Sequence, residues 1–288
     1  MPPPPTAPST AVVTDSTAYL SPAEIARLGV VVVPLQVIAG DRALDDDPRE
    51  IRAAGLSDAL AGRTGVTTSR PSPERFAEAY AALAARGVTG AVSVHVSGEM
   101  SGTAGSARLA ARDAPIPVEV IDSRSIAMGL GFPVLAAAEA ALAGGVREEV
   151  TAAARRHMDT ARTYFYLDTL ETLRRGGRVG VAAGLVGSAL RVKPLLHITG
   201  GSIVPLEKVR TSSRALARLE DLAAQACGEK PTAVAVQYLG DQAKAADLAE
   251  RLRRRVTALA RLEVVEMGAV IGAHVGPGML GVTVTPWP

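Results

Sequence analysis

Short apolar runs rich in β-branched residues alternate with amphipathic stretches in the first half of the chain. The apolar runs span residues 11–13, 30–37, 91–96 and 118–121. Runs of this length and composition are typical of strands. The clearest amphipathic stretch, Glu74–Arg86, repeats apolar side chains at i, i+3, i+4, i+7 and i+8 from Phe76, which predicts a helix. Strands that alternate with helices predict a mainly parallel, Rossmann-like sheet covered by helices on both faces.

The second half of the chain changes rhythm and predicts a second sheet. Its strand-like runs span residues 164–167, 195–198, 203–209, 233–239, 262–267 and 281–284. Gly200–Gly201, between two of these runs, is a hairpin signal, so part of this sheet is expected to be antiparallel. A further helix is expected within Asp241–Arg261, where leucine and valine residues recur at near-helical spacing up to Leu259.

These patterns together predict an α/β protein of two domains. We expect a disordered, proline-rich tail over residues 1–10. An N-terminal Rossmann-like domain is expected over residues 11–160, and a C-terminal domain of mixed sheet and helices over residues 161–288. A chain of 288 residues is long enough for two domains of ordinary size.

Composition excludes several classes of protein. Hydrophobic residues make up 48% of the chain and charged residues 21%, values typical of a folded chain. The formal net charge of +2, from 31 basic and 29 acidic residues, lacks the positive excess that nucleic-acid binding requires. The single cysteine, Cys227, excludes an intramolecular disulfide and a multi-cysteine metal site.

No segment is typical of export or of membrane insertion. The proline-rich N-terminus carries neither the basic nor the apolar region of a secretory signal. The most apolar stretch, residues 126–146, is rich in Ala and Gly and contains Pro133 and Glu139. We therefore expect a buried glycine turn and helix there instead of a membrane span. The chain is expected to be cytoplasmic.

Common nucleotide and metal motifs are absent from the sequence. No G-x-x-x-x-G-K-[ST] occurs, so the chain does not look like a kinase by itself. Gly129-Leu-Gly131 lacks the third glycine of a dinucleotide fingerprint. The four histidines are scattered and form no H-E-x-x-H. No cofactor and no metal are therefore expected.

Polar patches of Ser, Thr and Gly follow three of the predicted strands. Thr14–Ser16, Ser97–Ser106 and Asp122–Ser123 stand at these strand ends, where open α/β sheets bind their ligands. Helix capping by a single hydroxyl is the alternative, and it applies most directly to Ser21 and also to the Asp122–Ser123 pair. Ser101-Gly102-Thr103 offers hydroxyls and exposed amides ahead of a predicted helix, a combination suited to a carboxylate or phosphate.

Eight segments occur in the order and spacing of the DegV family. They are Thr14–Ser16, Thr68–Pro73, Met100–Thr103, Asp122–Ser125 with Gly129 and Gly131, Leu173–Arg178, Lys193–Leu196, Glu207–Thr211 and His274–Gly278. Each segment alone is weakly specific, but together they extend from about Ala11 to about Thr285. The sequence therefore resembles the DegV family along nearly its whole length.

The resemblance implies a fatty-acid-binding protein and not an enzyme. Proteins of the lipid-loading type in this family hold a long-chain fatty acid in a buried cavity and deliver it to a separate ATP-dependent fatty acid kinase, similar to dihydroxyacetone kinases. That kinase converts the carboxylate to an acyl phosphate, which links the family to phospholipid metabolism. The lack of a P-loop in this sequence agrees with such a division of labour.

The resemblance also implies which residues form the site. Thr68, Ser101 and His274 would bind the carboxylate, because two hydroxyls and an imidazole can satisfy its oxygens in an apolar cavity. Six residues are expected to support them: Ser16, Ser97, Gly102, Thr103, Ser123 and Gly276. Four arginines are candidates for phosphate or kinase contact, or for surface salt bridges: Arg174, Arg175, Arg178 and Arg210. Arg70 stands where the family commonly has Gln, either facing solvent or pairing with the head group.

Two other functions stay open at the level of sequence. Ser101 and His274 could serve as nucleophile and base of a hydrolase or acyltransferase. A small-anion sensor without a lipid cavity would use the same polar loop. The sequence also leaves open whether His274 donates as an imidazolium or as a neutral ring.

Overall fold

A parallel sheet of four strands, in the order β2-β1-β6-β7, builds the N-terminal half of the protein. We describe a computed structural model of the chain over residues 9–53, 66–178 and 193–287. The strands are β1 (Thr10–Asp15), β2 (Val31–Val33), β6 (Gly90–His95) and β7 (Val118–Asp122). Every residue of β1 and of β6 is buried, as expected for the central strands of a sheet covered on both faces.

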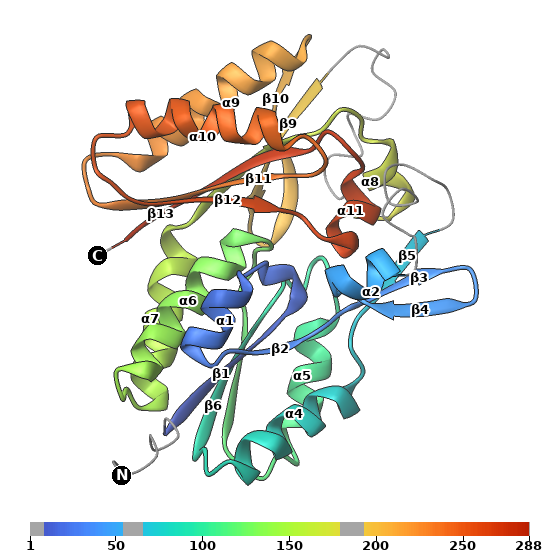
Figure 1. Ribbon diagram of the computed structural model, residues 1–288, viewed down its shortest axis with the longest axis vertical. Helices are drawn as coiled ribbons and strands as arrows, with labels where there is room; N and C mark the ends of the chain where they lie inside the picture. The colour runs from blue at the N-terminus through green and yellow to red at the C-terminus, as the bar shows by residue number, and fades with distance from the viewer. Residues whose placement is uncertain (1–8, 54–65, 179–192, 288) are drawn as a thin grey trace.

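Helices cover both faces of this sheet (Figure 1). On one face lie α1 (Pro22–Leu28), α6 (Met128–Leu142) and α7 (Arg147–Thr160), and on the other lie α4 (Pro73–Ala85) and α5 (Thr103–Ala111). Because successive side chains of a strand point to opposite faces, Val12 of β1 packs with α6 whereas Ala11 and Val13 pack with α4 and α5. A short 3-10 helix, η1 (Ser16–Ala18), follows β1.

A mixed sheet of six strands, in the order β10-β9-β8-β13-β11-β12, builds the C-terminal half. Its strands are β8 (Arg162–Tyr166), β9 (Lys193–Thr199), β10 (Ser202–Val209), β11 (Thr232–Tyr238), β12 (Leu259–Glu266) and β13 (Leu280–Pro286). β11 and β12 pair in parallel, and the other neighbouring strands pair antiparallel. Helices α9 (Ser212–Cys227) and α10 (Gln242–Arg255) cover the face that points away from the N-terminal half (Figure 1). On the opposite face, Ala233 and Ala235 of β11 share a core cluster with α6.

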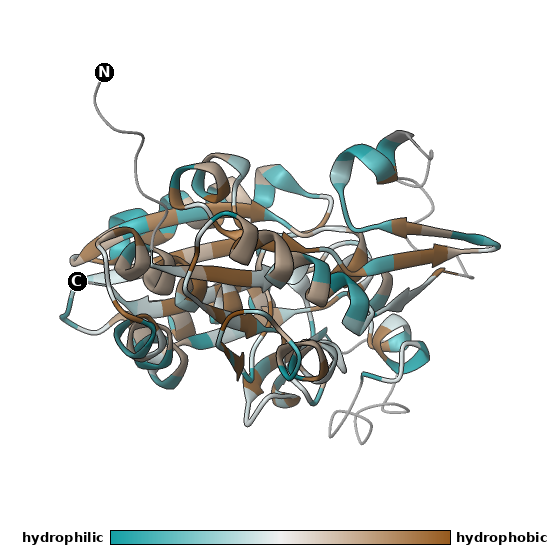
Figure 2. Ribbon diagram, turned by 90° about the horizontal axis from the view of Figure 1, so that it is seen from below, coloured by the Kyte–Doolittle hydropathy of each residue, from teal (hydrophilic) through white to brown (hydrophobic). Residues whose placement is uncertain are grey.

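A small antiparallel sheet, in the order β4-β3-β5, lies beside the junction of the two halves (Figure 1). It consists of β3 (Gln36–Ala39), β4 (Arg42–Asp45) and β5 (Val66–Ser69), with α2 (Pro48–Ala53) following β4. Two short helices of the C-terminal half, α8 (Glu171–Arg175) and α11 (Ala269–Val275), complete this region. In Figure 2 the strands are mostly hydrophobic, and hydrophilic residues concentrate on the helices and at the tip of the β3–β4 hairpin.

The predicted fold class is confirmed, with local corrections. The apolar run 30–37 is two strands, because it breaks around Pro34 and continues into a different sheet. The predicted helix over 241–261 ends at Arg255, and Leu259 instead begins β12. Gly200 and Gly201 form the predicted hairpin turn between β9 and β10, with φ of 61° and 89°.

The predictions for the N-terminal tail and for the apolar stretch 126–146 have different outcomes. Residues 1–8 of the predicted tail lie outside the described residues, whereas Thr10 is already the buried start of β1. The apolar stretch contains α6, whose interior holds Pro133 and whose apolar residues are largely buried. None of the helices within the described ranges is long and apolar enough to cross a membrane.

Candidate functional site

A cavity opens where the two large sheets and the small sheet meet. It contains about 860 Å³ of empty space, with its open mouth included. Its walls are mainly apolar, with contributions from Leu35, Val96, Phe165, Ile198, Ile203 and Ile271. Pockets for small molecules are typically lined mainly by apolar side chains, with a few polar groups that fix the orientation of the ligand. The cavity can therefore enclose an apolar molecule.

Thr68 and His274 meet at the polar end of this cavity. The hydroxyl Oγ1 of Thr68 lies 2.8 Å from Nε2 of His274. Thr68 is held on β5 by pairing with Val37 of β3, and His274 lies in the last turn of α11. Packing of Val270 against Val37 fixes α11 on the small sheet.

The N-terminus of α11 is anchored by two residues of the N-terminal half. The amide of Val270 donates to Oδ1 of Asp46 at 3.3 Å, and the amide of Ile271 donates to the hydroxyl of Tyr19 at 3.4 Å. Burial raises the pKa of Asp46 to about 6, and its Oδ2 has no hydrogen-bond partner among the described residues. The position of His274 therefore depends on residues more than two hundred positions earlier in the chain.

The His274 ring is neutral near pH 7. Burial, assisted by the nearby charge of Arg178, lowers the pKa of His274 to about 4. Its Nδ1 is buried without a hydrogen-bond partner among the described residues, and a methyl group added at Gly176 would lie 2.4 Å from it. We assign the hydrogen to Nε2, because a buried N–H at Nδ1 without an acceptor would carry the full desolvation cost. Nε2 then donates to Thr68, which leaves the Thr68 hydroxyl free to donate to a ligand.

Ser101 lies in the loop between β6 and α5 and lines the same cavity. The loop folds back on itself, since the amide of Ser101 donates to the carbonyl of Ser97 at 2.9 Å. The Ser101 hydroxyl lies 2.8 Å from Oγ1 of Thr103, the first residue of α5. The structure therefore brings Thr68, Ser101 and His274 to one cavity from three parts of the fold.

Two arginines also line the cavity. Nε of Arg178 donates to the carbonyl of Met100 at 3.2 Å, and Nη1 donates to the carbonyl of Gly176 at 2.7 Å. Arg70 lies over Gly102, where an added methyl group would be 2.5 Å from Nη1 of the arginine. Both arginines are also exposed to solvent, so they stand at the mouth of the cavity.

The other candidate arginines do not line the cavity. Arg174 and Arg175 pair with Glu171 at 2.8 and 3.8 Å. Arg210 is exposed at the end of β10. These three positions lie on the surface, and their role in contact with a partner stays a prediction.

The six predicted supporting residues lie around the cavity but are not part of its lining. The hydroxyl of Ser16 accepts from the amide of Leu35 at 3.2 Å. Ser97 donates to the carbonyl of Gly201 at 2.7 Å, and Ser123 donates to the carbonyl of Ser125 at 3.2 Å. These hydroxyls hold loops together.

The remaining three supporting positions adjoin residues of the site. Thr103 contacts Ser101 through its hydroxyl, Gly102 gives room to Arg70, and Gly276 lies against Thr172. Gly276 has φ of 72°, a backbone conformation that favours glycine.

Four polar residues of the lining were not assigned to the site from the sequence: Thr17, Ser69, Thr163 and Gln237. Gln237 accepts from the amide of Met128 at 2.9 Å and donates to Thr283 at 2.8 Å. Thr17 donates to Oδ1 of Asp15 at 2.5 Å. Of these residues, Gln237 is the one that the sequence could have indicated, because it is a polar residue within a mainly apolar strand.

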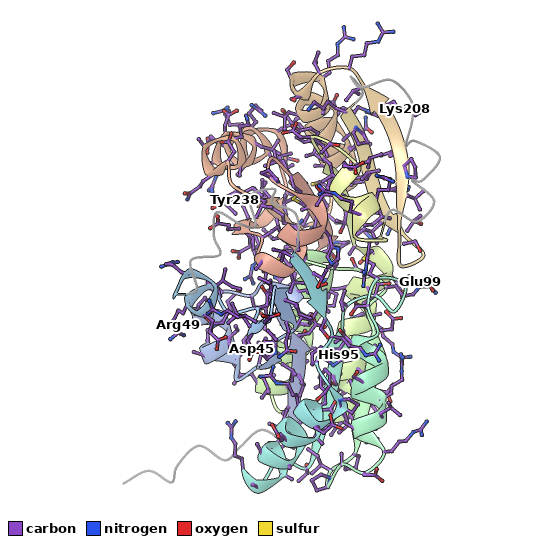
Figure 3. The ribbon with its side chains drawn as sticks, turned by 90° about the vertical axis from the view of Figure 1, so that its right-hand side faces the viewer. Asp45, Arg49, His95, Glu99, Lys208 and Tyr238 are labelled. Carbon is purple, nitrogen blue, oxygen red and sulfur yellow. The ribbon has the colours of Figure 1, made fainter. Side chains whose placement is uncertain are left out.

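A buried polar network lies behind the cavity, within the N-terminal half. Asp15 contacts Nδ1 of His95 at 3.1 Å, and Nε2 of His95 lies 2.7 Å from the hydroxyl of Ser93. Tyr80 contacts Ser93 in turn at 2.9 Å. Figure 3 places His95 inside this half, whereas Glu99 lies on the outer side near the junction of the two halves. The Asp15–His95 pair thus ties the end of β1 to β6.

The fold and the site define an α/β protein of two large sheets and one small sheet, with an apolar cavity that ends in hydroxyl, imidazole and guanidinium groups. The chain belongs to the DegV family: the sequence profile of that family, described as an uncharacterised protein family, matches residues 9–286. The predicted family membership is thereby confirmed.

Relatives and solved structures agree with this assignment. A DegV domain-containing protein of Streptomyces coelicolor is 55% identical over 275 residues, which cover 96% of this chain and 98% of the relative. A DegV family protein from Thermus thermophilus, described as binding fatty acid, superposes with a TM-score of 0.89 at 34% identity and covers 96% of this chain and 99% of that one. DegV from Bacillus subtilis, described as a fatty acid binding protein, gives a TM-score of 0.85 at 31% identity, with 96% and 99% covered.

Proposed function

We propose that this protein binds a long-chain fatty acid, with the acyl chain in the apolar cavity and the carboxylate at Thr68, Ser101 and His274. The observation that carries the proposal is the cavity itself: its walls are apolar, and the described lining contains hydroxyl, imidazole and guanidinium groups but no Asp or Glu. Such a cavity attracts a molecule with a long apolar tail and an anionic head. The fatty-acid-binding structures from Thermus thermophilus and Bacillus subtilis support the same assignment.

The polar end can compensate for the burial of a carboxylate. A carboxylate removed from water without hydrogen bonds is very unfavourable. Thr68 can donate its hydroxyl hydrogen because Nε2 of His274 already donates to its oxygen. Ser101 supplies a second hydroxyl, and the guanidinium groups at the mouth supply positive charge.

We further propose that the bound carboxylate is presented to a separate ATP-dependent fatty acid kinase similar to dihydroxyacetone kinases. The kinase would transfer a phosphoryl group from ATP to a carboxylate oxygen, and the products would be an acyl phosphate and ADP. The exposed arginines at and beside the mouth, Arg178 among them, suit contact with an acidic or phosphate-bearing partner surface. In this division of labour the chain is a cytoplasmic carrier without its own ATP site.

A hydrolase or acyltransferase that uses Ser101 and His274 is not favoured by the geometry. Nε2 of His274 lies against Thr68, and the Ser101 hydroxyl lies against Thr103. Nδ1 of His274 has no carboxylate among the described residues to orient the ring, unlike the base of a catalytic triad. The arrangement suits binding better than nucleophilic attack.

Lipid extraction from the purified protein, followed by mass spectrometry, tests the proposed function. We expect one long-chain fatty acid per chain, either retained from the cell or bound after incubation with a fatty-acid mixture. Absence of any acyl ligand under both conditions would overturn the proposal. Turnover of activated esters that Ser101→Ala abolishes would instead establish the hydrolase.

A further inference from the structure

The two arginines at the mouth bracket one short loop. Arg178 donates to the carbonyl of Met100, and Arg70 lies over Gly102. Ser101, which faces the cavity, stands between these two contacts. The guanidinium groups reach the loop from different parts of the fold, since Arg70 follows β5 of the small sheet and Arg178 follows α8 of the C-terminal half.

Two cations stand at this end of the cavity. Arg70 and Arg178 both line it, and among the described residues the side-chain hydrogen bonds of Arg178 go to backbone carbonyls and not to a carboxylate. The described lining contributes no Asp or Glu, and His274 stays neutral because its pKa is about 4. A fatty-acid carboxylate supplies one negative charge for these two cations. A phosphate monoester carries about −1.5 to −2 charges near pH 7 and three acceptor oxygens, so it can engage both guanidinium groups at once.

The start of α5 adds to the attraction for such a head group. Gly102 is the N-cap of this helix, and no side chain caps its first amides. Unpaired amides at a helix N-terminus favour anions and accept phosphate oxygens readily. These amides follow directly after Ser101, on the segment that the two arginines bracket.

We propose that Arg70 and Arg178 form a phosphate subsite at the mouth of the cavity, so that the cavity also holds lipids whose head is a phosphate monoester. This inference rests on the proposed fatty-acid binding, because the same cavity holds the tail. In the subsite the two guanidinium groups share the phosphate oxygens, and planar guanidinium groups bind phosphate through paired hydrogen bonds. Arg70 is thereby the residue that sets the preference for a doubly charged head over a carboxylate.

Binding of two stable probes to the full chain tests the subsite. The probes are hexadecyl phosphate and hexadecanoate, which share the tail length and differ in head charge, measured by displacement of a fluorescent fatty acid. For Arg70→Gln we expect the affinity for hexadecyl phosphate to fall by about tenfold, the effect of one lost hydrogen bond to a charged group. The affinity of Arg70→Gln for hexadecanoate should fall by a clearly smaller factor. Equal losses for the two probes, or no loss for either, would overturn the proposal.

A second variant keeps the charge of Arg70 and moves it. Gly102 has φ of −73°, which alanine adopts without strain, but the added methyl group would meet Nη1 of Arg70. Gly102→Ala should therefore displace the guanidinium and again weaken hexadecyl phosphate more than hexadecanoate. Arg112→Gln, at the exposed far end of α5, is the matched control and should leave both affinities unchanged.

Three further outcomes separate failure of the subsite from failure of the proposed fatty-acid binding and from binding of free phosphate. If the wild-type protein binds neither probe, the proposed fatty-acid binding fails together with the subsite. If hexadecanoate binds and hexadecyl phosphate does not, only the subsite fails. Inorganic phosphate at millimolar concentration should not displace either probe; displacement of hexadecyl phosphate alone would assign the two arginines to free phosphate and overturn the lipid assignment.

Discussion

Oγ1 of Thr68 and Nε2 of His274 lie 2.8 Å apart although 206 residues separate them in the sequence. The contact joins the small sheet to a helix of the C-terminal half, and it lies in the lining of the cavity. The geometry of the proposed head-group site therefore depends on how α11 packs against the small sheet.

Replacement of Thr68 by valine tests this contact. Valine keeps the shape and the β-branch that suit strand β5, but it removes both the acceptor for His274 and the donor to a carboxylate. We expect the affinity for a fatty acid to fall by about tenfold or more, since a hydrogen bond to a charged group contributes about 1.5–3 kcal/mol. Thr257→Val, at an exposed turn, is the matched control. Wild-type affinity in Thr68→Val would remove Thr68 from the site.

Ser97 and Ser101 lie in one loop and are expected to differ in role. Ser97 is buried and donates to the carbonyl of Gly201, so Ser97→Ala should lower the free energy of unfolding by about 1–2 kcal/mol with little effect on ligand affinity. Ser101→Ala should instead reduce ligand affinity with little effect on the free energy of unfolding, because Ser101 lines the cavity. Urea denaturation and ligand titration of both variants separate the two roles. Identical behaviour of the variants would contradict this division.

Gly176 leaves the space that the His274 ring occupies. Its φ of −70° suits any residue, but an added methyl group would lie 2.4 Å from Nδ1 of the ring. Gly176→Ala should displace the ring, reduce fatty-acid affinity and lower the free energy of unfolding by about 1–3 kcal/mol, as overpacking does. Gly105→Ala is the control, since that position in α5 is open and alanine there should stabilise the helix by about 0.5–1 kcal/mol. A stable Gly176→Ala protein with full affinity would contradict the prediction.

Asp46 should give the protein a distinctive pH dependence. Burial raises its pKa in the folded protein to about 6, above the ordinary value of 3.8, so the folded state binds this proton more tightly than the unfolded state. Its contribution to stability is therefore present below about pH 4 and declines as the pH rises to about 6. Asp46→Asn keeps an acceptor for the amide of Val270 and removes the buried charge.

Chemical denaturation of wild type and Asp46→Asn across this pH range measures the effect. The variant should gain stability relative to wild type as the pH rises from about 4 to about 7, by an amount on the order of 2 kcal/mol. Asp41→Asn, at the exposed turn of the same hairpin, should show no such trend. A stability difference between wild type and Asp46→Asn that does not change with pH would show that Asp46 titrates normally.

The sequence by itself determined most of the local structure. The strands of both large sheets follow from short apolar runs, since burial on both faces requires continuous apolar residues. The capping box of Ser21 and Glu24 at the start of α1, and the Gly200–Gly201 turn, follow from chemistry within a few residues. Such features depend on neighbours in the chain and can be predicted from a single sequence.

Only the tertiary structure decided which polar residues reach the cavity. Ser97 and Ser101 are both hydroxyl residues of one loop, but in the fold a carbonyl from a turn in the other half accepts from the hydroxyl of Ser97, whereas Ser101 lines the cavity. Likewise β12 takes Leu259 out of the expected helix because pairing with β11 outweighs helical periodicity. Thr68, Ser101, His274 and the two mouth arginines converge through contacts between distant segments, and no local pattern encodes such contacts.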